Sequence, residues 1–330
     1  MKFSLIICTY MRPDPLLKLL HSVQEQSVYP DQIVIVDGST DFTTTDRLAK
    51  NDFEKLDYFL VQPGERGLTK QRNYGIAKVA VDTTIICFLD DDIILEQDYF
   101  KRLLQTYEDF PEALGVGGYI TNEVQWEETA ESYNSNKQEF HYDGWKRKDG
   151  TRFVLRKKIG LDSNRPPGFA PDFSHGRSVS FLPPSGKIYE VEQLMGGVSS
   201  FRKTVFESLQ FSEYFEGYGL YEDADFSLRV AKKGKLYLNT NAVLAHYHNP
   251  SGRPNQYQYG KMVVRNGWYV WRIKNPKPSL TSKFKWHAIT ALLTAIRFTN
   301  ILTTKQKKEA FTEALGRTVG WWSLIINKPQ

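Results

Sequence analysis

The chain has 330 residues, enough for one large domain or for a core with an appended piece. Hydrophobic residues make up 41% and charged residues 25%, which is ordinary for a soluble globular protein. The net charge of +5 is too small to imply nucleic-acid binding, and no nucleic-acid motif is present, so we expect no nucleic-acid partner. This charge is compatible with an anionic substrate or with weak attraction to an anionic membrane surface.

The two cysteines and the absence of apolar targeting segments bear on location. Cys8 and Cys87 fall in apolar runs typical of buried strands, and their spacing fits neither a disulfide framework nor a zinc site. The pattern of the first residues predicts a strand and not a cleavable targeting segment, and no apolar stretch reaches the roughly 18 residues that a spanning helix needs. We therefore expect a cytoplasmic protein, with peripheral attachment to the inner face of the plasma membrane as a further option.

The first ninety residues alternate between predicted strands and predicted helices. The apolar runs at 3–8, 32–36 and 84–89 predict strands, and the spacing of apolar residues at 15–23 and 68–81 predicts helices. The strands are continuously apolar, which indicates a parallel sheet with both faces covered.

Polar residues end these predicted strands. Thr9, Asp37 and Asp90 lie at three strand ends, and ligands of such sheets bind beyond the carboxyl ends of the strands. We therefore expect these residues to converge in space.

The segment from Asn122 to Glu190 is polar, aromatic and rich in Pro and Gly. We interpret it as loops and short strands that cover the active site. Beyond it, the sequence predicts regular structure over 193–206, a helix over 222–233 and a strand over 236–246.

Two amphipathic helices are predicted after the Pro-rich turn at 275–278, over 283–301 and 307–326. Basic and aromatic residues interleave in them, as in helices that rest on a membrane surface. Packing on the catalytic domain or on a second subunit explains the same pattern equally well.

The strongest chemical signal is the run Asp90-Asp91-Asp92 after a buried strand. Clustered carboxylates are costly unless a cation neutralises them, and hard oxygen ligands select Mg²⁺ or Mn²⁺. Asp90 and Asp92 alternate, so both can face one site. A solvated acidic turn or a helix cap is the alternative.

Four other features fit the same chemistry, and each also has a structural explanation. Asp37 before a Gly-Ser turn can bind a base or ribose, or cap the turn. Arg72, in a helix that begins near Gly67, can meet phosphate, or belong to an ordinary charged turn. The acidic residues Glu222 and Asp223 suit a helix start, or supply a base. A histidine after the last strand can complete a metal site.

In this order, the motifs resemble the family 2 glycosyltransferases with the GT-A fold, from about residue 1 to residue 275. The segments that carry the resemblance are Cys8-Thr-Tyr-Met-Arg12, Val36-Asp-Gly-Ser-Thr-Asp41, Arg72-Asn-Tyr-Gly75, Leu89-Asp-Asp-Asp92, Tyr221-Glu-Asp-Ala-Asp-Phe-Ser-Leu-Arg229 and His246. A single Asp37 stands where the family usually has an acidic pair. Gly316-Arg-Thr-Val-Gly-Trp321 loosely resembles the tails of rhamnosyltransferase-like members.

The resemblance implies an α/β fold: a Rossmann-like, doubly wound, mainly parallel sheet with a C-terminal helical extension. Residues 1–275 would form the catalytic domain, with variable acceptor-side loops at 122–190, and residues 276–330 the extension. It also implies that Asp223 is the catalytic base with Glu222 beside it, and that the metal contacts are Asp92, Asp90 and His246, or His248 in another strand register. The residues implied for nucleotide-sugar binding are Thr9, Tyr10, Arg12, Asp37, Arg72, Asn73, Asp90 and Asp91.

The implied activity is transfer of a sugar from a nucleoside-diphosphate sugar, of UDP or dTDP type, to a hydroxyl of a glycan or lipid-linked acceptor. It would require Mn²⁺ or Mg²⁺, invert the anomeric carbon and serve cell-surface polysaccharide synthesis. Two alternatives are a sugar-phosphate nucleotidyltransferase and a non-catalytic carbohydrate-binding relative. The first needs a Gly-rich N-terminal loop that residues 8–15 lack, and the second has no reason to keep clustered carboxylates.

Overall fold

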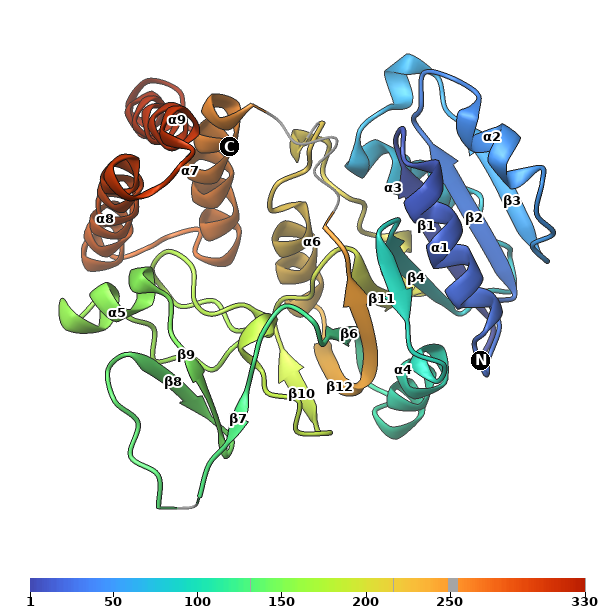
Figure 1. The fold of residues 1–330 in the computed structure, drawn as a ribbon, viewed down its shortest axis with the longest axis horizontal. Coiled ribbons are helices and arrows are strands. Elements are labelled where there is room, and N and C mark those ends of the chain that lie inside the picture. The colour runs from blue at the N-terminus through green and yellow to red at the C-terminus, as the bar shows by residue number, and fades with distance from the viewer. Residues whose placement is uncertain (131, 216, 249–254, 330) are drawn as a thin grey trace. The chain divides into compact units, whose positions relative to one another are not determined.

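The computed structural model of the chain describes residues 1–130, 132–215, 217–248 and 255–329. These residues form two compact units, each described here by itself. The first unit comprises the described residues of 1–125 and 184–252 and contains the large sheet (Figure 1). The second comprises those of 126–183 and 253–330 and contains a small sheet and the C-terminal helices.

The N-terminal half of the large sheet is parallel. Its strands are β1 (Phe3–Thr9), β2 (Gln32–Asp37), β3 (Leu56–Leu60) and β4 (Ile85–Asp90). β1 lies between β2 and β4, and β2 pairs with β3. The three predicted strands in this region are confirmed to within one residue at each end, because their apolar runs are buried on both faces.

The other half of the sheet is mixed. β11 (Val198–Arg202) runs antiparallel to both β4 and β6 (Ala113–Ile120), and β12 (Lys235–His246) is parallel to β6. β10 (Ile188–Val191) and β5 (Ile93–Leu95) pair antiparallel with β12. Among the described residues, the nine strands follow the order β10-β12-β6-β11-β4-β1-β2-β3, with β5 on β12.

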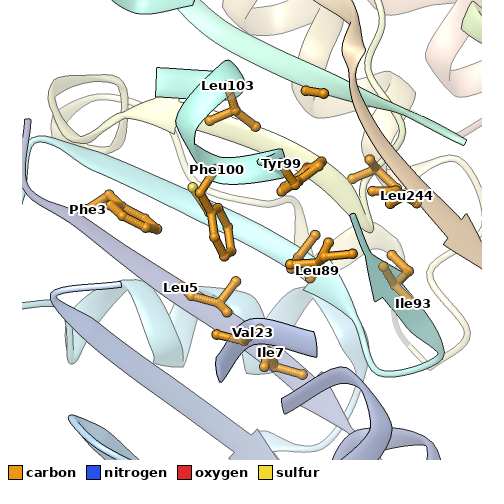
Figure 2. Packing of buried hydrophobic residues seen from close by; sticks show 14 of the residues in the cluster. Phe3, Leu5, Ile7, Val23, Leu89, Ile93, Tyr99, Phe100, Leu103 and Leu244 are labelled. Atoms are coloured by element: carbon orange, nitrogen blue, oxygen red, sulfur yellow. The ribbon is translucent and has the colours of Figure 1, made fainter. Parts of the chain in front are cut away.

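Helices cover both faces of the parallel half. α1 (Pro13–Gln24) and α4 (Tyr99–Asp109) pack on the face formed by Leu5, Ile7 and Leu89, and Phe100 of α4 lies against this face (Figure 2). α3 (Leu68–Ala77) packs on the opposite face. A Cβ on Gly75 would lie 2.8 Å from Ile6, so glycine lets α3 approach β1 closely. The α/β, doubly wound arrangement is thus confirmed.

Two predicted helix ends in this unit were too long. α3 ends at Ala77, and Val81, the predicted last residue, is 95% exposed, so the apolar residues after Ala77 were misread as a continuing helical face. α6 (Glu222–Ala231) ends two residues before the predicted end. Shorter elements are α2 (Thr43–Leu48) and the 3₁₀ turns η1 (Pro63–Glu65), η3 (Lys203–Glu207) and η4 (Glu213–Phe215).

The second unit contains two helices that the sequence did not predict. One is α5 (Thr151–Lys158), which lies inside the segment interpreted as loops. Before it in the chain comes a three-stranded sheet, with the strand order β7 (Glu127–Glu128), β9 (Trp145–Lys148) and β8 (Glu139–Tyr142). The 3₁₀ turn η2 (Val179–Phe181) follows it. With eight residues, α5 is too short to show clear periodicity. The other is α7 (Gln256–Lys274).

The C-terminal helices α8 (Leu280–Thr303) and α9 (Lys307–Ile326) confirm the two helices predicted there. A Cβ on Gly316 of α9 would lie 2.1 Å from the carbonyl oxygen of Tyr257 in α7, so this glycine permits backbone contact between the helices. Trp268 and Trp271 of α7, Trp286 of α8 and Leu324 of α9 form a buried core shared by the three helices. In the described parts of the chain, none of the helices combines the length and the apolar character needed to cross a bilayer.

Candidate active site

The carboxyl ends of β1, β2 and β4 meet at one edge of the sheet. Thr9 is the register partner of Asp37, and Cys8 is the partner of Asp90. The expected convergence of the three strand-end residues therefore follows directly from the parallel register.

The acidic run that begins with the last residue of β4 has one half-buried carboxylate, Asp90, and two buried ones, Asp91 and Asp92. Asp91 accepts hydrogen bonds from Thr9 Oγ1 at 2.7 Å and from Arg12 Nη1 at 3.0 Å. Burial raises the pKa of Asp91 to about 6, although Thr9 and Arg12 act in the opposite direction. Asp91 is thus held by β1 and the residue before α1, and Arg12 Nη1 also lies 3.4 Å from Asp92 Oδ2.

Asp90 and Asp92 form a group with His246 at the end of β12. One ligand atom from each of these residues lies within 4.8 Å of the other two, and His246 Nε2 is 3.1 Å from Asp92 Oδ1. Two carboxylates and an imidazole form a donor set that fits Mn²⁺ or Mg²⁺ with substrate phosphate. The geometry therefore suits a divalent cation.

Glu123 supports His246 from its other side. Its Oε1 lies 3.1 Å from His246 Nδ1 and 3.0 Å from His248 Nε2. Burial lowers the pKa of His246, but hydrogen bonds with Asp92 and Glu123 outweigh it and raise that pKa to about 10. A carboxylate on the second nitrogen is a common way to orient a metal-binding histidine. His246 reaches the Asp90–Asp92 pair, whereas His248 groups with Glu123 and His246.

Arg72 and Glu222 form a buried ion pair behind Asp90. Glu222 Oε1 accepts from Arg72 Nη1, and Arg72 Nη2 lies 3.6 Å from Asp90 Oδ1. Burial lowers the pKa of Arg72, but the negative charges of Glu222 and Asp90 raise it by more than burial lowers it, so the guanidinium stays charged. Asp90 is therefore linked through Arg72 to the first residue of α6.

Asp223 lies next to this pair at the start of α6. Its carboxylate accepts hydrogen bonds from the amides of Gly196, at 3.3 Å, and Ala224, at 2.7 Å. Burial raises the pKa of Asp223 even though both bonds lower it. The raised pKa brings this carboxylate closer to the range useful for a general base.

The adjacent glycines Gly196 and Gly197 make this crowding feasible. A Cβ on Gly197 would lie 2.1 Å from the Asp90 carboxylate, and one on Gly196 would lie 2.5 Å from Glu222 Oε1. Neither this glycine pair nor Glu123 was predicted from the sequence. The Gly-Gly dipeptide before β11 was an available signal, whereas nothing in the sequence marks Glu123.

Of the remaining predicted binding residues, Asp37 and Tyr10 lie at the ends of β2 and β1, whereas Asn73 lies in α3. Asp37 is fully buried and accepts from the Ser39 amide at 2.7 Å and from the Tyr58 hydroxyl at 2.8 Å. Tyr10 is exposed. The Asn73 side chain bonds both the amide and the carbonyl of Phe211, so it fixes the loop before α6.

The chain is an α/β protein with a carboxylate–imidazole group at the carboxyl edge of its sheet, and comparison with known proteins identifies its family. The model of glycosyl transferase family 2 matches residues 4–190, more than half of the chain. The chain belongs to this family and is a family 2 glycosyltransferase.

Curated relatives are consistent with this assignment. The chain is 24% identical over 274 residues to the O-antigen chain rhamnosyltransferase RfbN of Salmonella typhimurium, covering 82% of this chain and 74% of the relative. It is 30% identical over 125 residues to the glucosyl-dolichyl phosphate glucuronosyltransferase of Haloferax volcanii, covering 36% of this chain and only 38% of that protein.

Solved structures show the fold. The mannosyltransferase PcManGT of Pyrobaculum calidifontis, in complex with GDP-Man and Mn²⁺, matches with a TM-score of 0.55 at 13% identity, covering 98% of this chain and 87% of that one. GalNAc-T7 with UDP, GalNAc and Mn²⁺ matches with a TM-score of 0.52 at 16% identity, covering 82% of this chain and 49% of that one.

Proposed function

We propose that the protein transfers a sugar from a nucleoside-diphosphate sugar to a hydroxyl of a glycan or lipid-linked acceptor, with inversion at the anomeric carbon. The observation that carries the proposal is the grouping of Asp90, Asp92 and His246 at the sheet edge, linked through Arg72 to the start of α6. Two proteins of similar fold support it, since one is solved with UDP, GalNAc and Mn²⁺ and the other with GDP-Man and Mn²⁺.

Asp92, Asp90 and His246 would hold the divalent cation, Mn²⁺ or Mg²⁺. When bound, such an ion neutralises the charge that develops on the departing diphosphate. Asp91 does not take part directly. Through Thr9 and Arg12 it fixes the backbone that presents Asp90 and Asp92.

Asp223 would act as the base. Its carboxylate is oriented by two backbone amides, and burial raises its pKa. It would accept the proton of the acceptor hydroxyl while that oxygen attacks the anomeric carbon from the face opposite the diphosphate. A correctly positioned base contributes roughly 10²–10⁴ in rate. Glu222 would hold Arg72 in place beside Asp90 rather than touch the proton.

The nucleoside would lie along the ends of β1 and β2. Exposed Tyr10 suits contact with the base, while buried Asp37 and Thr9 shape the floor of the site. Arg12 and Arg72 supply positive charge near the diphosphate. The donor would be a UDP- or dTDP-sugar, whereas the structural neighbour PcManGT binds GDP-Man.

The acceptor class is proposed from the relatives. One relative is an O-antigen chain rhamnosyltransferase, and the other is a glucosyl-dolichyl phosphate glucuronosyltransferase. Both support an acceptor that is a glycan on a larger or lipid-linked carrier. Cell-surface polysaccharide synthesis would be the corresponding process.

The test is a donor screen. The intact chain is incubated with Mn²⁺ and UDP-, dTDP- and GDP-sugars, and nucleoside diphosphate release and nucleotide binding are measured. We expect one donor to be hydrolysed slowly, with loss of release in Asp92→Ala and Asp223→Asn. Asp92→Ala should also lose Mn²⁺-dependent binding, whereas Asp223→Asn should keep it. Absence of binding by any nucleotide, or pyrophosphate release from a nucleoside triphosphate and a sugar phosphate, would contradict the proposal.

A further inference from the structure

Each of the helices α8 and α9 carries a line of exposed apolar side chains. On α9 they recur at intervals of three or four residues and thus share one face: Phe311, Leu315, Val319, Trp322 and Ile326. On α8 the same spacing relates Leu280 to Phe284 and Phe298 to Leu302. Their exposed fractions range from 36% to 91%, although the opposite faces of both helices are already buried. These two lines are called the α8–α9 apolar face below.

The two lines form one surface. α8 and α9 pack against each other, and the rings of Phe298 and Phe311 contact at a centroid distance of 6.4 Å. In Figure 1, α8 and α9 lie side by side. Large contiguous apolar surfaces are uncommon on proteins without a partner, so this face is a candidate interaction site.

The surrounding charge indicates what the partner is. Residues 255–330 contain thirteen Lys and Arg and two Glu. One of the two, Glu313, is buried and paired with Arg297 and Arg317, and the thirteen cations less the two acids leave this segment a net charge of +11. Lys283 and Lys285 stand on either side of Phe284 in the same helical turn. An anionic surface complements this pattern, whereas a second copy of the chain would bring two cationic faces together.

A pocket at one end of the apolar face has the same character. It has a volume of about 500 Å³, and tryptophans and cations line it, among them Trp268, Trp322, Arg272, Lys283 and Lys328. None of the described residues that line it is acidic. Cations beside indole rings suit the phosphate of a lipid headgroup at the boundary with its acyl chains.

We infer that the α8–α9 apolar face docks on an anionic lipid bilayer, with its apolar side chains in the headgroup boundary and its lysines on lipid phosphates. Helices with basic flanks and exposed aromatic side chains bind membranes in this way without crossing them. The inference does not depend on the proposed sugar transfer, since bilayer binding is measured without donor or acceptor.

The experiment is vesicle flotation of the intact chain, using phosphatidylcholine with or without phosphatidylglycerol. Binding should be at least about tenfold stronger to the anionic vesicles and should weaken from about 0.1 M to about 1 M salt. Phe284→Ser with Leu302→Ser should lower binding by at least about tenfold. Lys283→Glu with Lys285→Glu should do the same on anionic vesicles.

Two matched double variants control for exposure and charge. Phe42→Ser with Val81→Ser removes two equally exposed apolar side chains from the first unit, and Lys18→Glu with Lys50→Glu makes the same charge change there. Both should bind like the intact chain, and thermal melts should show that all variants fold. Absence of binding by the intact chain, or equal loss in a control pair, would overturn the inference. The inference would also be overturned if the intact chain sedimented as a dimer and the Phe284→Ser, Leu302→Ser variant as a monomer, because the apolar face would then bind a second copy of the chain.

Discussion

The guanidinium of Arg72 in α3 donates a hydrogen bond to the carboxylate of Glu222 at the start of α6, and both side chains are almost completely buried, at 3% and 5% exposure. Two features surround this pair: Asp90 on the side of the proposed metal, and the Gly196-Gly197 turn. The pair thus ties the donor side of the site to the helix that presents the proposed base. Each of these contacts leads to a measurable expectation.

Removal of Glu222 should destabilise the fold more than removal of the whole pair. Glu222→Leu leaves the Arg72 charge buried without its closest partner, which costs about 3–5 kcal/mol. Arg72→Met together with Glu222→Leu should recover most of that loss in urea unfolding, but not activity, because Arg72 also faces Asp90.

The exposed pair of Lys2 and Asp82 provides the control. Asp82→Leu should leave the free energy of unfolding almost unchanged, since exposed ion pairs contribute little. If the double variant at 72 and 222 were as unstable as Glu222→Leu alone, the buried charge would not be the cause.

Metal binding should depend on Asp92 far more than on acidic residues elsewhere. Asp92→Asn removes a charged ligand and the partner of His246, so we expect Mn²⁺ affinity to fall by at least about tenfold. Titration of Mn²⁺ by calorimetry or paramagnetic resonance measures this directly. Asp46→Asn, an exposed change in α2, should bind Mn²⁺ like the intact chain. Equal affinity in Asp92→Asn would remove Asp92 from the ligand set.

Gly197 should tolerate no side chain. A Cβ there would lie 2.1 Å from the Asp90 carboxylate. Because this distance is far below van der Waals contact, the Asp90 side chain must rotate away. Gly197→Ala should therefore reduce Mn²⁺-dependent activity by at least about tenfold while the chain still folds. Gly64→Ala is the matched control, because a Cβ at Gly64 meets nothing within 4 Å. Full activity in Gly197→Ala would show that the position of Asp90 does not matter.

The sequence could predict the parallel half of the sheet because its signals are local. The apolar runs in β1, β2 and β4 end in polar residues, and parallel register alone brings Thr9, Asp37 and Asp90 to one edge. Helix ends were harder to predict because the sequence does not tell whether an apolar residue such as Val81, which is exposed, is buried against the sheet.

The rest of the site could not be predicted because it depends on pairings distant in sequence. Glu123 meets His246 because β6 pairs with β12 and Asn122 bonds the His246 backbone, and nothing in residues 122–190 marks it. The hydrogen bonds of buried Asp91 likewise depend on where Thr9 and Arg12 lie. In the second unit, α7 was missed although its contact with Gly316 accounts for a motif noticed in the sequence.

The pH dependence of the reaction should report the proposed base. Asp223 is active when deprotonated, so the rate should fall as pH drops through its pKa, about tenfold per unit below it. Burial raises that pKa above the 3.8 of an ordinary aspartate, so the acid limb should begin at a higher pH than an exposed carboxylate would give. The rate is measured at saturating Mn²⁺, with Mn²⁺ affinity determined at every pH, so that loss of metal is not mistaken for protonation of the base.

Asp223→Asn keeps the shape of the side chain but cannot accept the proton. Its residual rate should be roughly 10²–10⁴ lower than that of the intact chain and flat across the pH range of the acid limb. Unfolding by urea should show a folded protein, because the side-chain amide oxygen can still accept from one of the two backbone amides, which bond different oxygens of the Asp223 carboxylate. A residual rate with the same acid limb would assign the limb to another group. Glu222 would then be the next carboxylate to test, since it lies beside Asp223 and is held by Arg72.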